Sequence, residues 1–133
     1  MADSLDLEVV TPERELVHEQ VAEVQVPGKD GYMGVLPGHA PLLSELGTGA
    51  LAYVTGGRRH VLAVHGGFLE VIEDHVRVLA DAAERAEEID VERARVSQRR
   101  AQQQASAMAD GADALAALAR AQTRIAVAEQ TQR

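Results

Sequence analysis

Four arginines in the last third of the chain are spaced so that they could meet one polyphosphate. Arg93 and Arg100 are seven residues apart and Arg120 and Arg124 four apart, so each pair lies along one helix face. If the helices turn back near Asp110, Arg100 and Arg120 stand at the same level, roughly 15 Å from the turn. Guanidinium groups pair with phosphate oxygens and keep their charge at neutral pH. The alternative is a solvated Arg and Glu helix surface, the usual arrangement of such charges.

The other reactive side chains form no pattern typical of a catalytic or metal site. The chain has no Cys, which excludes thiolate zinc sites and cysteine nucleophiles. None of its five His forms an HxH or HxxxH pair, and His60 and His65 are expected on opposite faces of one strand. Surface His on strands is the simpler interpretation. Residues 31–34 (GYMG) lack the Lys and the helix of a phosphate-binding loop. We predict no catalytic residue and no metal ligand.

Composition divides the chain after Ala83 into two parts. The first part holds all four Pro, ten of the eleven Gly and most of the Val, whereas the second part is rich in Ala, Arg and Gln. Turn formers and β-branched residues favour short strands, and Ala, Arg and Gln favour helices. We therefore expect a β domain over residues 1–83 and a helical hairpin domain over residues 84–133.

Alternating residues in the first part predict strands separated by turns. Apolar and acidic residues alternate over residues 5–9, and Ala22, Val24 and Val26 are expected on one face of a run over residues 17–26. Further runs cover residues 51–54, 59–64, 68–72 and 76–80, with turns at Gly56-Gly57, Gly66-Gly67 and Glu73-Asp74. Many strands without an intervening helix argue for an antiparallel sandwich or a flattened barrel.

The second part predicts two helices joined by a tight turn. Asp90 is a suitable N-cap for a helix over about residues 91–108, which Asp110-Gly111 interrupts. Asp113 can cap a second helix over about residues 114–129. Its apolar stripe would contain Leu115, Leu118, Gln122 and Ile125. Because Ala side chains bury little area, this hairpin should be only marginally stable and able to move.

Charge and hydropathy exclude two classes of function. The chain has 21 acidic and 13 basic residues, a net charge of −8, which disfavours nonspecific nucleic-acid binding. No segment approaches the roughly 18 consecutive apolar residues of a membrane span. Residues 1–6 include acidic side chains, whereas a secretory or transit peptide has basic ones at this position. The predicted fold class is α+β: an N-terminal antiparallel β-sandwich followed by a C-terminal antiparallel two-helix hairpin. We expect no nucleic-acid partner and no direct membrane insertion.

Three blocks of the sequence resemble the epsilon subunit of bacterial F-type ATP synthases. Residues 31–43 (GYMGVLPGHAPLL) are similar to the family's G-x-L-G-x-L-P-G-H-x-P-L segment. Residues 66–71 (GGFLEV) and 76–84 (VRVLADAAE) resemble its next block, and residues 89–94 (IDVERA) match its I/L-D-x-x-R-A motif. The blocks cover nearly the whole chain in the family's order. The family's architecture is the sandwich and hairpin expected above.

The resemblance implies a non-catalytic rotor subunit of the proton-translocating enzyme, peripheral on the cytoplasmic face of the bacterial plasma membrane. The sandwich resembles the part that binds the gamma subunit and the c-ring at the foot of the central stalk. The tail resembles the part that can extend along gamma, contact the alpha and beta subunits transiently and inhibit ATP hydrolysis. No cofactor is required, but in some bacterial members the folded hairpin binds ATP as a regulatory ligand.

The same resemblance implies site residues. The ATP-binding set of those members falls on Glu84, Asp90, Arg93, Ala94, Arg100, Arg120 and Arg124. The contacts with gamma and the c-ring fall on Tyr32, Met33 and His39. Tyr32 stands where the family often has an acidic residue, so aromatic packing is expected there in place of a charge contact.

Two other classes of function compete with this one. A free-standing ligand-binding β-sandwich, whose helical tail dimerises as a coiled coil, fits the same composition. A small β-barrel enzyme with a His-bound metal is the weaker alternative, because the His spacing does not favour a ligand set. Copurification with a gamma subunit and a c-ring separates the first alternative from the rotor subunit, and metal analysis tests the second.

Overall fold

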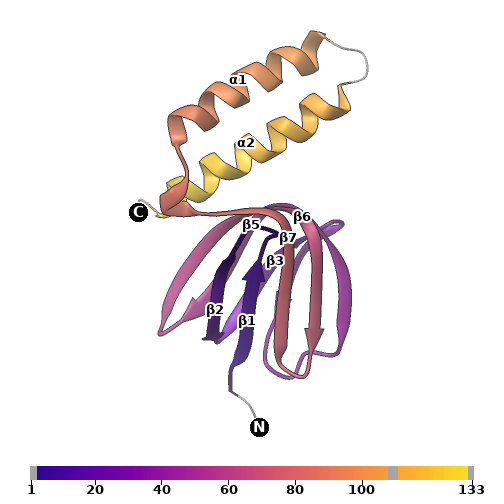
Figure 1. Cartoon of the computed structure of the whole chain (residues 1–133), viewed down its shortest axis with the longest axis vertical. Helices are drawn as coiled ribbons and strands as arrows, with labels where there is room; N and C mark the ends of the chain where they lie inside the picture. The colour runs from indigo at the N-terminus through magenta and orange to yellow at the C-terminus, as the bar shows by residue number, and fades with distance from the viewer. Residues whose placement is uncertain (1–2, 108–110, 132–133) are drawn as a thin grey trace.

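The protein consists of a β-sandwich with a helical hairpin resting on one end of it (Figure 1). The computed structural model describes residues 3–107 and 111–131. Its elements are β1 (Leu5–Val10), β2 (Glu15–Val21), β3 (Glu23–Gly28), β4 (Gly31–Val35), β5 (Leu42–Thr55), β6 (Arg58–Ile72), β7 (His75–Arg85), the short 3-10 helix η1 (Ala86–Glu88), α1 (Val91–Ala107) and α2 (Ala112–Thr131). The predicted α+β fold, a sandwich followed by two helices, is confirmed.

The strands form one sheet in the order β2-β1-β7-β6-β5-β3-β4. Neighbouring strands are antiparallel, as predicted, except that β1 and β7 are parallel. The sheet folds over so that the end of β2 approaches β5: the Ala22 amide donates to the Val54 carbonyl at 2.7 Å, and the Thr55 hydroxyl donates to the Gln20 carbonyl at 3.0 Å. This closure encloses one apolar core.

Aliphatic side chains fill the core of the sandwich. Leu5, Leu7 and Val9 are fully buried and alternate with acidic residues on the other face, as the sequence pattern predicts. The chain's single Phe, Phe68, is 52% exposed, so it adds little to this interior. Each buried Val or Leu contributes about 1.5–3 kcal/mol, and their number makes the sandwich the stable part of the molecule.

The run predicted over residues 17–26 is two strands, and the prediction for Ala22 is wrong. Val21 and Val24 are both buried although they are three residues apart, and Ala22 between the strands is exposed. The chain passes from β2 to β3 at this point, and the extra residue shifts the alternation of faces. Composition alone does not reveal this shift, because Ala is compatible with either face.

The Gly66-Gly67 pair, expected to be a turn, lies inside a single bent strand. β6 continues across the pair, with His65 opposite Ala82 and Gly67 opposite Ala80 on β7. Gly66 has a φ of 71° and Gly67 a φ of 118°. A Cβ on Gly67 would lie 2.0 Å from the Leu79 carbonyl oxygen, so only glycine fits. The two glycines therefore form a bend, and because of this bend the long strand β6 takes part in both halves of the sandwich.

The two helices meet along a seam of alanines. The buried residues of α1 are Ala94 and Ala101, seven residues apart, and those of α2 include Ala114 and Ala121 at the same spacing. The apolar stripe predicted for α2 is wrong, because Leu115 is 57% exposed and Gln122 is exposed too. Small side chains allow the helix axes to approach closely, and the bulky residues are left outside.

The start of α1 agrees with the sequence prediction, and the start of α2 differs from it. The Asp90 carboxylate accepts a hydrogen bond from the Arg93 amide at 3.1 Å, which makes it the predicted N-cap of α1. Asp113 lies within the first turn of α2 and does not precede it, because that helix begins at Ala112. Its negative charge still lies at the helix N-terminus, where it is favourable.

The hairpin docks on the sandwich through α2. Val127 and Ala128 pack with Ala63 on β6, Ala86 on η1 and Ile89. α1 packs on the far side of α2, away from the strands (Figure 1). Because the cluster is small and half of its side chains are alanines, it buries less apolar area than the core of the sandwich, and the tail is held less firmly than the strands hold one another.

The bend in β6 gives a first prediction, that Gly67→Ala destabilises the sandwich strongly. The new Cβ would collide with backbone of β7, so we expect a loss of about 3 kcal/mol or more in the free energy of unfolding, measured by urea denaturation. Gly57→Ala is the matched control: its φ of 74° is also positive, but nothing lies within 4 Å of its Cβ. It should lose only about 1 kcal/mol. Equal losses in the two variants would contradict the steric argument.

Candidate functional site

A polar pocket of about 280 Å³ lies where the hairpin meets the sandwich. Strand β7, η1 and Asp90, which directly precedes α1, supply carboxylates; α1 supplies one arginine and two small residues, and α2 supplies one arginine. The lining residues are Glu84, Glu88, Asp90, Arg93, Ala94, Ser97 and Arg124. Five of these are members of the ATP-binding set that the sequence resemblance implies, and they come from three separate elements.

Glu84 and Arg124 form the central contact of this pocket. The Arg124 Nε donates to the Glu84 Oε1 at 2.5 Å, and both side chains are about 30% exposed, 29% for Glu84 and 31% for Arg124. His65 and Arg124 together lower the pKa of Glu84 from 4.5 to about 2, against the opposing effect of burial. The contact joins the end of strand β7 to helix α2, so it attaches the tail to the sandwich.

His65 lies beneath this contact, and sequence analysis missed it. Its side chain is 5% exposed, and its Nε2 is 3.5 Å from the Glu84 Oε1, too far for a strong hydrogen bond. Neither ring nitrogen has a hydrogen-bond partner among the described residues. Sequence analysis placed it on an exposed strand surface. The neighbouring Val61 and Ala63 on the same face were the signal that another element covers this side of β6.

Arg93 faces the pocket from α1 without an ion pair among the described residues. Asp90, one turn before it, is occupied as the helix cap and accepts from the Arg93 amide, not from its guanidinium. Ala94 is 3% exposed at the seam with α2, and Ser97 adds a hydroxyl one turn further on. The pocket therefore offers one free guanidinium, from Arg93, and one that is engaged, from Arg124.

Arg100 and Arg120 do not line the pocket. Arg100 is exposed on α1, and Arg120 is half-buried on α2. Both lie one to two turns nearer the far end of the hairpin than Arg93 and Arg124. Of the four arginines that spacing brings to one face, the structure gathers two around this pocket, and the roles of the other two stay predictions.

The segment before α1 is held by an ion pair from a distant part of the sequence. Arg14, in the turn after β1, contacts both carboxylate oxygens of Glu88, at 2.7 and 2.9 Å. This hydrogen-bonded contact lowers the pKa of Glu88 and raises that of Arg14. Arg85 adds a hydrogen bond to the Leu16 carbonyl at 2.5 Å. These contacts fix the direction in which the chain leaves the sandwich.

The residues implied as gamma and c-ring contacts lie in and just after β4. Tyr32 is 57% exposed, and its hydroxyl accepts a hydrogen bond from the Ala50 amide at 3.1 Å. Met33 packs against the core and is partly buried. His39 is half-buried, and its Nδ1 lies 2.6 Å from the Ala40 carbonyl oxygen. Their roles as contacts stay predictions.

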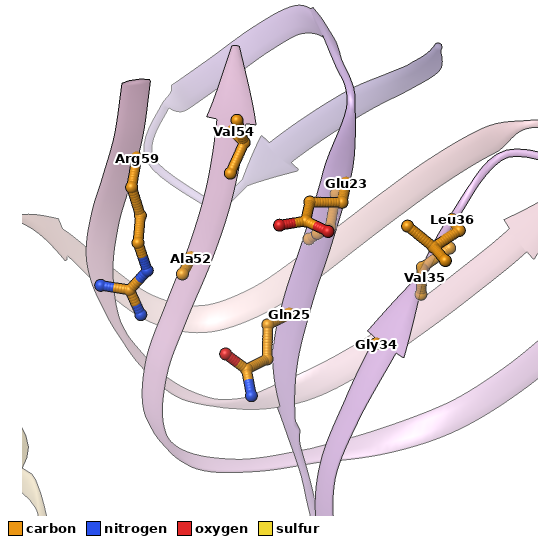
Figure 2. Close-up of a pocket in the computed structure, with 9 residues that line it drawn as sticks. Glu23, Gln25, Gly34, Val35, Leu36, Ala52, Val54 and Arg59 are labelled. Atoms are coloured by element: carbon orange, nitrogen blue, oxygen red, sulfur yellow. The ribbon is translucent and has the colours of Figure 1, made fainter. Parts of the chain in front are cut away.

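A second pocket, of about 290 Å³, lies on the outer face of β3, β4 and β5 (Figure 2). Glu23 and Gln25 reach across it from β3, the small Ala52 lies on β5, and Arg59 stands on the far side. The Arg59 guanidinium also donates to the Gln130 side chain of α2 at 3.1 Å. One carboxylate and one guanidinium neutralise each other here, so this pocket favours no charged ligand.

Within residues 3–107 and 111–131, no three His, Asp or Glu side chains are placed to hold a metal ion. Within the same ranges, no helix has the length and the apolar character that crossing a membrane requires.

Comparison with known proteins identifies close relatives. Residues 4–86 match the family model described as ATP synthase, Delta/Epsilon chain, beta-sandwich domain. The ATP synthase epsilon chain of Solibacter usitatus is 62% identical over 133 residues, which cover 98% of this chain and 99% of that one. The ATP synthase epsilon chain of Nitratidesulfovibrio vulgaris (strain DP4) is 48% identical over 130 residues, with 96% and 97% covered. The likeness therefore includes the tail as well as the sandwich.

Solved structures share the fold. A chain in the cryo-EM structure of the Euglena gracilis mitochondrial ATP synthase, OSCP/F1/c-ring, superimposes with a TM-score of 0.75 at 23% identity, over 99% of this chain and 81% of that one. A chain in the central stalk/c-ring structure of the Tetrahymena thermophila mitochondrial ATP synthase gives 0.54 at 12% identity, over 63% and 68%. The first match spans both the sandwich and the hairpin, so their combination is a shared architecture.

The Glu84–Arg124 contact gives a second prediction, for a double-mutant cycle with Glu84→Gln and Arg124→Gln. We expect a coupling energy of about 1–2 kcal/mol for docking of the tail, because the pair is partly shielded from water. Hydrogen exchange of the α2 amides reports the docking free energy. The matched control is Glu92→Gln with Arg95→Gln, an exposed pair within α1 at 3.0 Å. It should show at most about 0.5 kcal/mol.

The same contact has a defined pH dependence. Folding lowers the pKa of Glu84 from 4.5 to about 2, through His65 first and then through Arg124, so the ionised carboxylate that pairs with Arg124 is fully present above about pH 4.5 and is lost as the pH falls towards 2. It should be constant between pH 6 and 8. A coupling energy that changes between pH 6 and 8 in the cycle would contradict this assignment.

Proposed function

This chain belongs to the ATP synthase delta/epsilon family, as the sequence resemblance implied, and from that premise we propose that it is a rotor subunit that also regulates ATP hydrolysis. Its curated relatives are epsilon chains, a non-catalytic subunit of the ATP synthase complex. The proposal assigns assembly with gamma and the c-ring to the sandwich, and control of hydrolysis to the tail. The observation that carries it is the division of the chain into a self-contained core and a lightly docked hairpin.

Exposed apolar side chains on the sandwich support the assembly role. Phe68 on β6 pairs directly with Leu79 on β7, and the two are 52% and 43% exposed. Ile72 and Leu43 extend the same outer surface, at 47% and 72% exposure. Large apolar side chains gathered on one face are typical of a protein contact. Through such partners the chain would lie peripherally on the cytoplasmic face of the bacterial membrane.

The hairpin has the properties that a movable regulator requires. Its docking contact is a small apolar cluster, and its outer surface carries Val96 and Leu115 at 44% and 57% exposure. These two side chains gain nothing from the docked position, so a partner that covers them favours the extended one. We propose that the extended tail contacts gamma and, transiently, the alpha and beta subunits, where it restrains hydrolysis.

The polar pocket supports ATP as a regulatory ligand of the folded hairpin. Arg93 and Arg124 face it from different helices, so one triphosphate could bridge α1 and α2. The Glu84 carboxylate already accepts the hydrogen bond from Arg124 that a phosphate group would accept, so the phosphate must displace this carboxylate. At about 280 Å³ the pocket holds part of a nucleotide, and the remainder would lie along the hairpin towards Arg100 and Arg120.

The two alternative classes of function have no observation in their favour. A free-standing sandwich with a dimerising tail would need a continuous exposed apolar seam along the hairpin, but the alanine seam is used between α1 and α2, and the described helices expose two large apolar side chains, Val96 and Leu115. An enzyme with a His-bound metal would need a ligand set, and the described residues contain none.

Removing the tail tests the regulatory role. We expect deletion of residues 91–133, which keeps Arg14 and Glu88 in place, to raise ATP hydrolysis by the assembled complex without loss of assembly. Hydrolysis and gamma copurification are measured together, and adding back the full chain should restore inhibition. Inhibition that rests on arginine contacts should also weaken as salt rises, because charges are screened over about 8 Å at physiological salt. Unchanged hydrolysis over a wide range of ATP would contradict the regulatory role.

ATP binding is tested by Arg93→Ala in the full chain. Loss of one phosphate contact is worth roughly 1.5–3 kcal/mol, so affinity measured by calorimetry should fall about ten- to a hundredfold. Arg99→Ala removes the same charge from the exposed face of α1, outside the pocket, and should change affinity less than about threefold. Equal losses in the two variants would indicate nonspecific attraction. No binding by the parent chain at millimolar ATP would refute the ligand itself.

A further inference from the structure

A third pocket, of about 390 Å³, lies where strand β6 extends beyond the end of β7. The last pair between these two strands joins Leu62 to Arg85, whereas β5 accompanies β6 as far as Arg58. Within the described part of the chain, residues 58–61 therefore have a paired strand on one side only, and this leaves room for the recess. The lining of this arginine pocket includes Arg58, Arg59, His60, Arg85, Glu87 and Gln130.

Three guanidinium groups and one carboxylate line the arginine pocket. Arg58 and Arg59 stand at the start of β6, Arg85 at the end of β7, and Glu87 belongs to η1. Over residues 1–83 the chain has 13 acidic residues and 5 basic ones, and two of those five are Arg58 and Arg59. The pocket is therefore a local excess of positive charge on an acidic domain.

Arg58 and Arg59 differ from the other basic side chains of the sandwich, because they have no carboxylate partner. The remaining three basic residues over 1–83 each have a carboxylate oxygen within 3.5 Å: Arg14, Lys29 and Arg77. Within residues 3–107 and 111–131, Arg58 makes no ion pair, and Arg59 donates to the uncharged Gln130 at 3.1 Å. Arg85 donates to the Leu16 carbonyl and makes no ion pair in these ranges either. All three guanidinium groups therefore lack a direct counterion there.

Two carboxylates lie nearby without pairing with these arginines. Glu87 lines the pocket itself, and Glu23 faces Arg59 across the neighbouring pocket of Figure 2. Among the described residues, neither Glu87 nor Glu23 forms an ion pair. Guanidinium groups held close together repel one another, and an anion that contacts two or three of them at once removes this repulsion. The arrangement therefore favours an anion with several charged oxygens over a single carboxylate.

We propose that the arginine pocket binds a polyphosphate chain and is a second anion site, separate from the pocket at Glu84. The fork of each guanidinium can donate two parallel hydrogen bonds to one phosphate group, so successive groups of a chain would contact Arg58, Arg59 and Arg85. The net charge of −8 opposes a long nucleic acid, so the ligand is a short chain. The site lies mainly on the sandwich, so it depends neither on movement of the tail nor on nucleotide binding by the hairpin.

The test is a titration of the full isotope-labelled chain with sodium tripolyphosphate at constant ionic strength, followed by NMR. We expect saturable shifts of the amides of Gly56 and Gly57, which form the turn next to Arg58. Arg58→Gln removes one charged donor, so the affinity measured at these amides should fall about ten- to a hundredfold. Arg77→Gln is the matched control, because it removes the same charge eight residues before Arg85 on the same strand. It should change the affinity less than about threefold.

The two anion sites are distinguished by where the shifts occur. Arg93→Gln should weaken the shifts of the α1 amides and leave the titration of Gly56 and Gly57 unchanged. A parallel titration with ATP identifies the source of the chain. The ligand is a free polyphosphate if tripolyphosphate binds the turn at least as tightly as ATP, and a nucleotide if ATP binds the same amides more tightly. Either result supports the site.

Three results would overturn the inference. The first is no saturable shift of Gly56 and Gly57 at millimolar tripolyphosphate, the second is an equal loss of affinity in Arg58→Gln and Arg77→Gln, and the third is loss of the turn shifts in Arg93→Gln. In the first case, shifts confined to α1 and α2 would show that only the pocket at Glu84 binds the anion. The proposed function would then stand, and the arginine pocket would not be a site.

Discussion

The docking of α2 on the outer face of β5 and β6 is the contact on which the position of the whole tail depends. Half of its apolar side chains are alanines, and a buried methyl group contributes about 0.8 kcal/mol. Such a contact barely offsets the freedom that the helices lose on docking. The partly buried pair of Glu84 and Arg124 is therefore comparable in size to the apolar contact around it, and charge can decide between docked and released tails.

The sandwich supplies the rigid half of this contact. Glu84 is near the end of β7, where the chain leaves the sheet, and the Arg14–Glu88 pair sets its direction from there. The Gly66 bend fixes His65 beneath Glu84. The tail brings mainly cations to these carboxylates. A hairpin attached in this way can leave and return without disturbing the apolar core, because none of the core residues belongs to it.

The sequence pattern is sufficient for the sandwich and for the existence of two helices, since alternation and capping are local properties. Asp90 illustrates this, because a cap depends only on the residues that follow it. The burial of His65 and the exposure of Leu115 could not be predicted in this way. Both depend on which side of α2 meets the sheet. Alanine seams carry little hydrophobic signal, so the larger but exposed Leu115 misled the prediction of the stripe.

Glu84 links docking of the tail to the proposed binding of an anionic ligand. Arg124 can satisfy either the Glu84 carboxylate or a phosphate group of a ligand, and a ligand that also reaches Arg93 holds α1 to α2. When a phosphate takes Arg124, Glu84 loses its strong partner, so the ligand and the carboxylate compete for one guanidinium. The competition is reciprocal, because each partner weakens the other's hold on Arg124 to the same extent.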